Sequence, residues 1–71
     1  MQKGTIGKRI RHLRKASGIS QQELAEKLYI SQKTVSSWEC GRTAPDSEML
    51  LKLSAVFGTS LNYLFTGKER L

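Results

Sequence analysis

The sequence predicts an all-α fold, and three observations support this prediction. Residues that commonly cap helix N-termini stand directly before short segments whose apolar residues recur at helical spacing. Glycines, which commonly end helices, follow several of these segments. The length of 71 residues allows one small domain, so we expect a single unit over residues 1–71.

The first helix is expected in the N-terminal part of the chain. Ile6, Ile10 and Leu13 form a narrow apolar stripe there, which suits packing inside a bundle better than binding to a membrane surface. Six of the 12 Lys and Arg residues lie within the first 15 positions, with no acidic residue among them. We therefore expect a basic helix with one packed side.

The second helix has a recognisable start. Ser20 is suited to the N-cap position, and Glu23, three residues later, completes a capping box. The helix should therefore begin near Gln21. Its inward side is formed by Leu24, Ala25 and Leu28.

A third helix should follow after a sharp turn at residues 29–31. Ser31 is a second N-cap candidate, so we expect the helix over about residues 32–40. Val35 and Trp38 lie three residues apart and share its inner face. The opposite face carries Lys33, Ser36, Ser37 and Cys40.

Two more helices are expected in the last third of the chain. Pro45 and Asp46 open one of them, and Gly58 closes it. Ser60 caps a last short helix that ends at Gly67. The apolar residues of these two helices are Met49, Leu50, Leu53, Val56, Phe57, Leu61, Leu64 and Phe65.

The second and third helices together have the features of a DNA-reading motif. Two short helices joined by a tight turn over residues 21–40 are typical of DNA-binding proteins, and the slender polar side of the third helix suits a major groove about 12 Å wide. Gln32 can pair with adenine, Lys33 can donate to guanine and Ser37 can bond to either, so these three are the predicted base contacts. The third helix alone is equally compatible with an ordinary surface helix, which is also polar outside.

Motifs along nearly the whole chain resemble one family. They are I-G-K-R-I-R-x-L-R-K near the start, S-Q-x-E-L-A in the second helix, I-S-Q-x-T-V-S-x-W-E-x-G-R around the third, then L-x-K-L-S-x-x-F-G and a final L-F-T-G. In these motifs the chain is similar to the lambda repressor-like helix-turn-helix domains of phage repressors, Cro proteins and Xre-type regulators. The resemblance implies a compact five-helix bundle that binds operator DNA as a dimer, with residues 32–40 as the recognition helix.

Two positions depart from the family pattern. Tyr29 stands in the turn where glycine is most common, and in left-handed geometry a residue with a side chain costs roughly 1–2 kcal/mol. We therefore expect a slightly remodelled turn within an intact motif. Cys40 stands where relatives often carry an asparagine that bonds a phosphate, and a thiol is a poor substitute. We do not count Cys40 among the DNA contacts.

The resemblance also implies a structural ion pair. Relatives often pair the arginine that matches Arg14 with the glutamate that here is Glu39. Such a pair would join the end of the recognition helix to the first helix. Removing one partner of a buried pair can cost about 3–5 kcal/mol, whereas an exposed pair is worth far less.

Contacts to the DNA backbone are expected where backbone amides point outward. These places are the start of the second helix and the loop after the third helix. By resemblance, Gln21 is a phosphate ligand, and Arg42 with Thr43 grips the backbone beyond the recognition helix. The full set of predicted backbone contacts is Gln21, Ser31, Ser36, Arg42 and Thr43.

The charge of the chain favours a polyanionic partner. Its 12 Lys and Arg and 6 Asp and Glu residues give a formal net charge of +6, which favours phosphate binding and makes it salt-dependent. RNA and acidic membranes would be attracted as well. However, the aromatic residues are scattered or at core spacing instead of forming a base-stacking platform. No stretch reaches the roughly 18 apolar residues of a membrane span. Double-stranded DNA is therefore the expected partner.

Enzymatic and metal-binding functions are not expected. The chain has one His, one Cys, no paired carboxylates on a helix face and no glycine-rich phosphate loop. His12 and Cys40 are two isolated ligands, whereas a structural zinc site needs four. We expect neither a cofactor nor a metal. A single cysteine precludes an internal disulfide, and no signal-peptide-like segment is recognisable, so we expect a cytoplasmic protein.

Large apolar residues crowd the C-terminal end, more than a short terminal helix can hide. Leu61, Asn62 and Phe65 are therefore candidates for a two-fold dimer contact. Plain core packing of these residues fits the sequence equally well. The polar residues 68–71 are expected to fray.

These features predict a sequence-specific, double-stranded DNA-binding transcriptional regulator. Repression is the commoner outcome in the family. We therefore expect a repressor that binds an operator as a homodimer, and we expect this operator to be an inverted repeat. The alternative is an antitoxin-type module that masks a partner protein, although the extra segment that usually wraps a toxin is not recognisable here. The sequence leaves open whether these residues are a complete regulator or the DNA-binding head of a longer protein.

Overall fold

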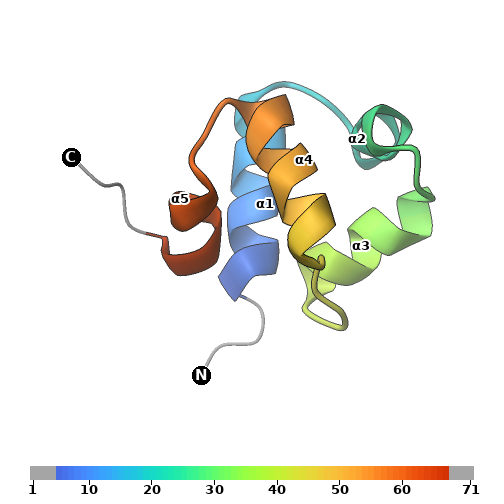
Figure 1. Ribbon diagram of the computed structural model, residues 1–71. Helices are drawn as coiled ribbons and strands as arrows, with labels where there is room; N and C mark the ends of the chain where they lie inside the picture. Colours follow the sequence, from blue (N-terminus) through green and yellow to red (C-terminus); the bar gives the residue numbers. More distant parts are fainter. Residues whose placement is uncertain (1–4, 68–71) are drawn as a thin grey trace.

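Five α-helices make up the described part of the chain. The computed structural model describes residues 5–67, and the predicted all-α, five-helix architecture is confirmed (Figure 1). Residues 68–71, for which we expect fraying, lie outside the described residues. The helices are α1 (Thr5–Ala16), α2 (Gln21–Leu28), α3 (Gln32–Cys40), α4 (Ser47–Phe57) and α5 (Leu61–Thr66).

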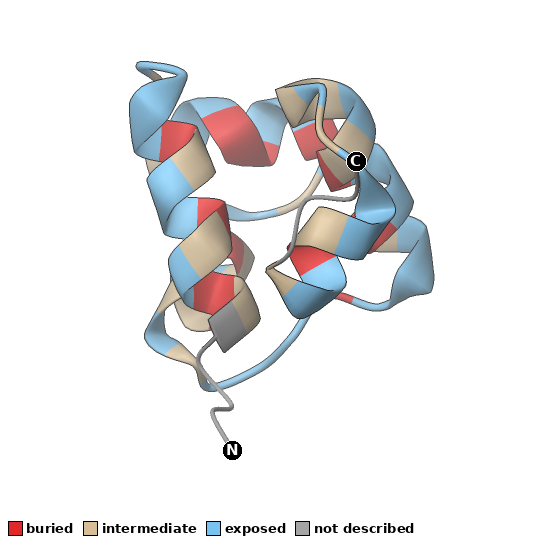
Figure 2. Ribbon diagram, turned by 90° about the vertical axis from the view of Figure 1, so that its left-hand side faces the viewer, coloured by how far each residue is buried: buried red, intermediate tan, exposed pale blue. Residues whose placement is uncertain are grey.

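One small apolar core lies between the five helices. α1 packs against α3 and α5, α2 against α3 and α4, and α4 also against α5. Figure 2 shows that the buried parts of the helices face the inside of the molecule. All residues predicted to face inward in α2 and α3 are buried. The buried apolar residues are Ile10, Leu24, Ala25, Leu28, Val35, Trp38, Leu50, Leu53 and Leu64.

Side-chain caps begin the helices that follow α1. Ser20 Oγ accepts a hydrogen bond from the Glu23 amide at 3.0 Å, and Glu23 Oε1 accepts one from the Ser20 amide at 2.8 Å. The predicted capping box is therefore confirmed, and it satisfies two amides that a helix start otherwise leaves free. Ser31 and Ser60 cap α3 and α5 as predicted.

The start of α4 differs slightly from the prediction. Asp46 is the N-cap, and its Oδ1 accepts a hydrogen bond from the Met49 amide at 2.9 Å. Pro45 precedes this cap, and the helix begins at Ser47. The residues expected to open the helix therefore stand just outside it.

Left-handed residues end α2 to α5. Gly41, Gly58 and Gly67 end α3, α4 and α5, and the ends at Gly58 and Gly67 were predicted. α2 ends at Tyr29 with φ of 59°, and the Tyr29 amide donates to the carbonyls at the end of the helix. The turn keeps its left-handed geometry, so the expectation of a remodelled turn is wrong. Because the Tyr29 side chain is 90% exposed, the ring does not clash with the surrounding helices and only backbone strain remains.

At Gly7, the backbone of α1 lies very close to the backbone of α3. A Cβ atom at this position would lie 2.0 Å from the carbonyl oxygen of Trp38, far inside any permitted contact. The backbones of the two helices therefore meet directly, which requires a residue without a side chain. The sequence had not indicated this role.

Replacing Tyr29 by glycine should stabilise the domain by about 1 kcal/mol, because the release of left-handed strain exceeds the added entropy of the unfolded chain. Tyr29 makes little buried contact that would be lost. Thermal unfolding followed by circular dichroism measures the change. Tyr29→Ala, which keeps a Cβ atom, is the matched control and should melt near the wild type. A lower melting temperature for Tyr29→Gly would refute this account of the turn.

Gly7→Ala should destabilise the domain by about 1–3 kcal/mol, because the added methyl group forces α1 and α3 apart. The sign is informative, since glycine to alanine inside an unobstructed helix stabilises by roughly 0.5–1 kcal/mol. Chemical denaturation gives the free energy of unfolding. Lys8→Ala, at the exposed neighbouring position, serves as the control and should change that energy little. A stabilised Gly7→Ala variant would rule out the close approach.

Candidate nucleic-acid interface

The recognition helix predicted from the sequence is anchored on one side and open on the other. On its inner side, Val35 and Trp38 are buried in the core. On its outer side, Gln32 and Lys33 are exposed and Ser37 is half-buried. The three predicted base contacts therefore project from the part of α3 that the core does not cover.

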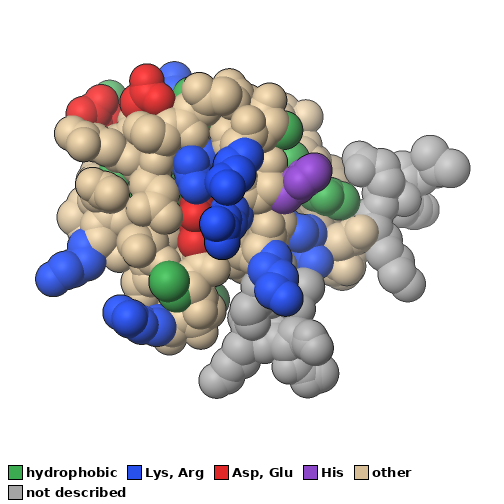
Figure 3. All heavy atoms as spheres, turned by 180° about the vertical axis from the view of Figure 1, so that it is seen from behind, with side chains coloured by type: hydrophobic (Ala, Val, Ile, Leu, Met, Phe, Trp, Pro, Cys, Tyr) green, Lys and Arg blue, Asp and Glu red, His purple; other side chains and the backbone are tan. Residues whose placement is uncertain are grey.

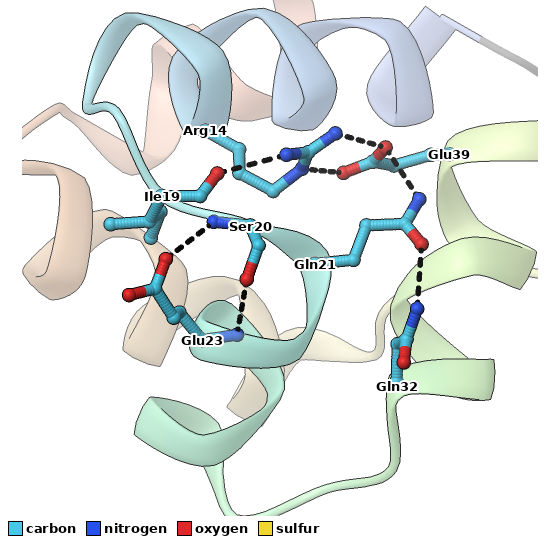
Figure 4. A network of polar contacts seen from close by, with 7 residues as sticks. All are labelled: Arg14, Ile19, Ser20, Gln21, Glu23, Gln32 and Glu39. Carbon is cyan, nitrogen blue, oxygen red and sulfur yellow. Dashed lines mark hydrogen bonds and ion pairs between the residues drawn. The ribbon is translucent and has the colours of Figure 1, made fainter.

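A buried ion pair connects the end of α3 to α1 (Figure 4). Arg14 Nε lies 2.7 Å from Glu39 Oε2, and Arg14 Nη2 donates to Glu39 Oε1 at 3.1 Å. The side chains are only 10% and 4% exposed. Hydrogen bonding to Glu39 raises the pKa of Arg14 and outweighs the lowering caused by burial. Arg14 Nη1 also donates to the carbonyl of Ile19 at 2.9 Å, so the guanidinium holds the α1–α2 loop as well.

Two glutamines extend this network from the protein interior to the surface (Figure 4). Gln21 Nε2 donates to Glu39 Oε1 at 3.0 Å, and Gln32 Nε2 donates to Gln21 Oε1 at 3.4 Å. The structure thus brings the predicted phosphate ligand Gln21 together with the predicted base contact Gln32. Their contact was not foreseen, because it depends on how α2 and α3 are placed relative to one another.

Predicted backbone contacts at the start and middle of α3 have different surroundings. Ser31 is exposed at the N-terminus, where its Oγ accepts a hydrogen bond from the Thr34 amide at 3.2 Å and shares another with Thr34 Oγ1 at 3.0 Å. Ser36 lies within the helix and is half-buried. The two serines therefore do not form one cluster.

The loop after α3 folds back onto the helix. The Arg42 amide donates to the carbonyl of Ser37 at 3.0 Å, and Thr43 Oγ1 donates to Ser37 Oγ at 3.0 Å. Arg42 and Thr43 are both exposed. The structure therefore places two predicted backbone contacts beside the predicted base contact Ser37, at the C-terminal end of α3.

Exposed basic side chains occur on α1 and around α3. Figure 3 shows Lys and Arg side chains spread over one face, with acidic side chains at its upper left edge and further acidic atoms among the central basic side chains. Two arginines of α1 do not contribute freely to this positive surface, because Arg14 pairs with Glu39 and Arg9 hydrogen-bonds to α5. Arg9 was not singled out from the sequence. The exposed Lys and Arg residues on α1, α3 and the following loop are Lys8, Arg11, Lys15, Lys33 and Arg42.

The predicted dimer contacts line an apolar groove between α4 and α5. Leu61 is 41% exposed and Phe65 is 65% exposed, and both line the groove with Asn62. Ser47 and Leu50 complete a hollow of about 410 Å³. Core packing of α5 is carried by Leu64, which is fully buried.

Two further observations concern residues 5–67. No helix in this part of the chain is both long and apolar enough to cross a membrane. His, Cys, Asp and Glu side chains of these residues form no group of three that could hold a metal ion.

Residues 10–64 match the HTH_3 family model, described as helix-turn-helix. The chain belongs to this family of Cro/C1-type and Xre-type DNA-binding domains. This membership confirms the resemblance inferred from the motifs and the prediction that the domain is not an enzyme.

Two relatives of this helix-turn-helix chain are longer than the chain itself. The chain is 39% identical over 67 residues to the HTH-type transcriptional regulator ImmR of Bacillus subtilis, covering 94% of the chain and 52% of ImmR. It is 34% identical over 64 residues to the HTH-type transcriptional activator BcrR of Enterococcus faecalis, covering 90% of the chain and 31% of BcrR. The chain therefore spans about half the length of the first relative and about a third of the second.

A solved structure supports the same assignment. The crystal structure of the P22 c2 repressor in complex with a synthetic operator matches with a TM-score of 0.86 and 37% sequence identity. The match covers 96% of this helix-turn-helix chain and 100% of the repressor chain. The predicted lambda repressor-like fold is therefore confirmed.

Glu39→Ala should lower the melting temperature strongly, because it leaves Arg14 buried without its partner at a cost of about 3 kcal/mol or more. For a domain this small, a loss of about 3 kcal/mol corresponds to roughly 12–24 °C. Circular dichroism on heating measures the effect. Glu39→Gln keeps an acceptor oxygen and should lose less stability. An unchanged melting curve for Glu39→Ala would refute a structural role of the pair.

Proposed function

We propose that this domain binds operator DNA as part of a transcriptional regulator, with α3 in the major groove. The observation that carries the proposal is the uncovered polar side of α3, which buried contacts to α1 and α2 hold in one orientation. The P22 c2 repressor, which matches over nearly the whole chain, was crystallised with a synthetic operator. The relatives include an activator and a repressor, and we propose repression through occupancy of the promoter.

The base contacts in this proposal are Gln32, Lys33 and Ser37. Gln32 gives one amide hydrogen to Gln21, so its Oε1 and second amide hydrogen remain for the two groups that adenine offers in the major groove. Lys33 is exposed and donates to guanine. Ser37 accepts a hydrogen bond from Thr43, which leaves its own hydroxyl hydrogen for an acceptor on a base edge.

The backbone contacts lie around the same helix. Gln21 keeps one amide hydrogen for a phosphate after donating the other to Glu39. Arg42 reaches a phosphate with its exposed guanidinium, whereas Thr43 must release Ser37 before its hydroxyl can donate to one. Ser31 and Ser36 complete the proposed set. These contacts set the register of the domain on the duplex and leave base selection to α3.

We also propose that two copies of the chain contact each other through the groove between α4 and α5, and that the resulting dimer binds an inverted repeat. The groove is apolar, and Leu61 and Phe65 leave much of their surface uncovered in the single chain. A second copy related by a two-fold axis would present the same surface in return. The proposed place of action is the cytoplasm.

Selection of bound duplexes from a random double-stranded pool at about 0.15 M salt tests the proposal. We expect the wild type to converge on an inverted repeat. Lys33→Ala should weaken the base preference at one position of each half-site, lowering the discrimination between bases there by about 1–3 kcal/mol. Ser37→Ala should weaken the base preference at another position. Lys27→Ala removes the same charge from an exposed site on α2 and is the matched control. It should retain the wild-type preference.

The contrary result would be a pool that fails to converge, with affinity that falls steeply as salt rises. The domain would then be a basic bundle that binds phosphate without reading bases. Protein partners, as for an antitoxin-type module, would become the next targets.

A further inference from the structure

Arg9 is a basic residue of α1 whose guanidinium group contacts α5 instead of extending into solvent. Its Nε donates to the carbonyl of Leu64 at 3.0 Å, and its Nη2 donates to the carbonyl of Phe65 at 3.1 Å. The residue is half-buried, whereas its neighbours Lys8 and Arg11 are exposed. One guanidinium group thus binds two consecutive carbonyls at the end of α5.

The contacts from Arg9 supply hydrogen-bond donors and a positive charge at the C-terminal end of α5. A helix leaves its last carbonyls without partners, and a helix of only six residues has little stability of its own. The last turn of α5 contains no basic residue that would offset the negative end of its dipole. Arg9 provides both the donors and the positive charge from another helix.

The backbone beyond α5 is shaped to admit this side chain. Gly67 ends the helix with φ of 80°, and a Cβ atom there would lie 2.6 Å from Arg9 Nη1. The glycine therefore serves the turn and also leaves space for the guanidinium. This second observation shows that the Arg9 side chain also lies directly against the backbone that ends α5.

The outer surface of α5 is the part that these Arg9 contacts would control. Leu64 faces the core with no exposed surface, while Leu61 and Phe65 face the groove shared with α4. The carbonyls held by Arg9 belong to Leu64 and Phe65, so the bonds act on the same turn that presents the Phe65 ring.

We propose that Arg9 is a positioning residue for the dimer surface and not a DNA phosphate contact. This inference rests on the proposed dimer, in which the groove receives a second copy. Arg9 keeps α5 in the register that aligns Leu61 and Phe65 with the groove. Of these two arginines of α1, Arg9 thus serves assembly, whereas Arg11 is exposed and remains available to the phosphate backbone.

The test compares two single-charge variants of the same helix, Arg9→Met and Arg11→Met, together with Arg9→Lys. Sedimentation equilibrium of each 71-residue variant gives its dimer dissociation constant. The salt dependence of binding to a duplex that contains one selected half-site gives the number of phosphate contacts. Hydrogen exchange of the α5 amides reports its local opening, and far-UV circular dichroism verifies that each variant is folded.

Arg9→Met should raise the dimer dissociation constant about tenfold, as expected for the loss of a charge-assisted hydrogen bond. It should accelerate exchange in α5 and leave the affinity and salt slope on one half-site unchanged. Arg11→Met should show the reverse, with a salt slope reduced by about one. Arg9→Lys keeps the charge but reaches fewer carbonyls, so it should restore part of the dimer affinity.

A wild-type dimer constant and normal α5 exchange in Arg9→Met would overturn the proposal. A salt slope lowered by about one in that variant would overturn it too, because Arg9 would then be a phosphate contact. Equal losses of dimer and half-site affinity would mean that Arg9 only stabilises the fold, which also contradicts the proposal. If the wild type itself stays monomeric alone and on the operator, the proposed dimer has failed, and α5 exchange alone then decides whether Arg9 holds the helix.

Discussion

The orientation of α3, the proposed recognition helix, depends on one carboxylate, that of Glu39. It lies in the last turn of α3, where it accepts hydrogen bonds from Arg14 of α1 and Gln21 of α2. The carboxylate is almost entirely shielded from water. Burying such a pair adds little stability compared with apolar packing, but the bonds have direction, and losing one partner is costly. Glu39 therefore acts mainly on geometry: it fixes where the outer side of α3 points.

α1 is the common support for both ends of the molecule. Ile10 lies in the core, Gly7 lets the backbone touch α3, and Arg14 binds the end of the same helix. Two residues after Gly7, Arg9 reaches α5. The surface proposed to face DNA and the surface proposed to face a second copy thus both belong to helices that pack against α1.

Local signals made most of the fold predictable from the sequence. The capping box of Ser20 and Glu23 involves residues close in the chain, so their types and spacing suffice to identify it. Helical spacing likewise separates the buried from the open side of α3. The contacts of Gly7, Arg9 and Gln21 were not predictable in this way, because each joins two different helices and depends on how these helices pack. Two of these three contacts also involve backbone atoms of the partner, which have no residue type to recognise.

The glutamine pair at the head of α3 has a consequence for redesigning the binding preference of this domain. Lys33 protrudes from α3 without sharing the network of Gln21 and Glu39, so its identity can be varied independently of the scaffold. Gln32 is different, since its amide is oriented by Gln21, which is itself held by the buried carboxylate. A library that varies position 32 alone would test every new side chain beside Gln21, whose amide is placed to bond a glutamine at position 32. Positions 21 and 32 form a single unit of variation and need to be randomised together.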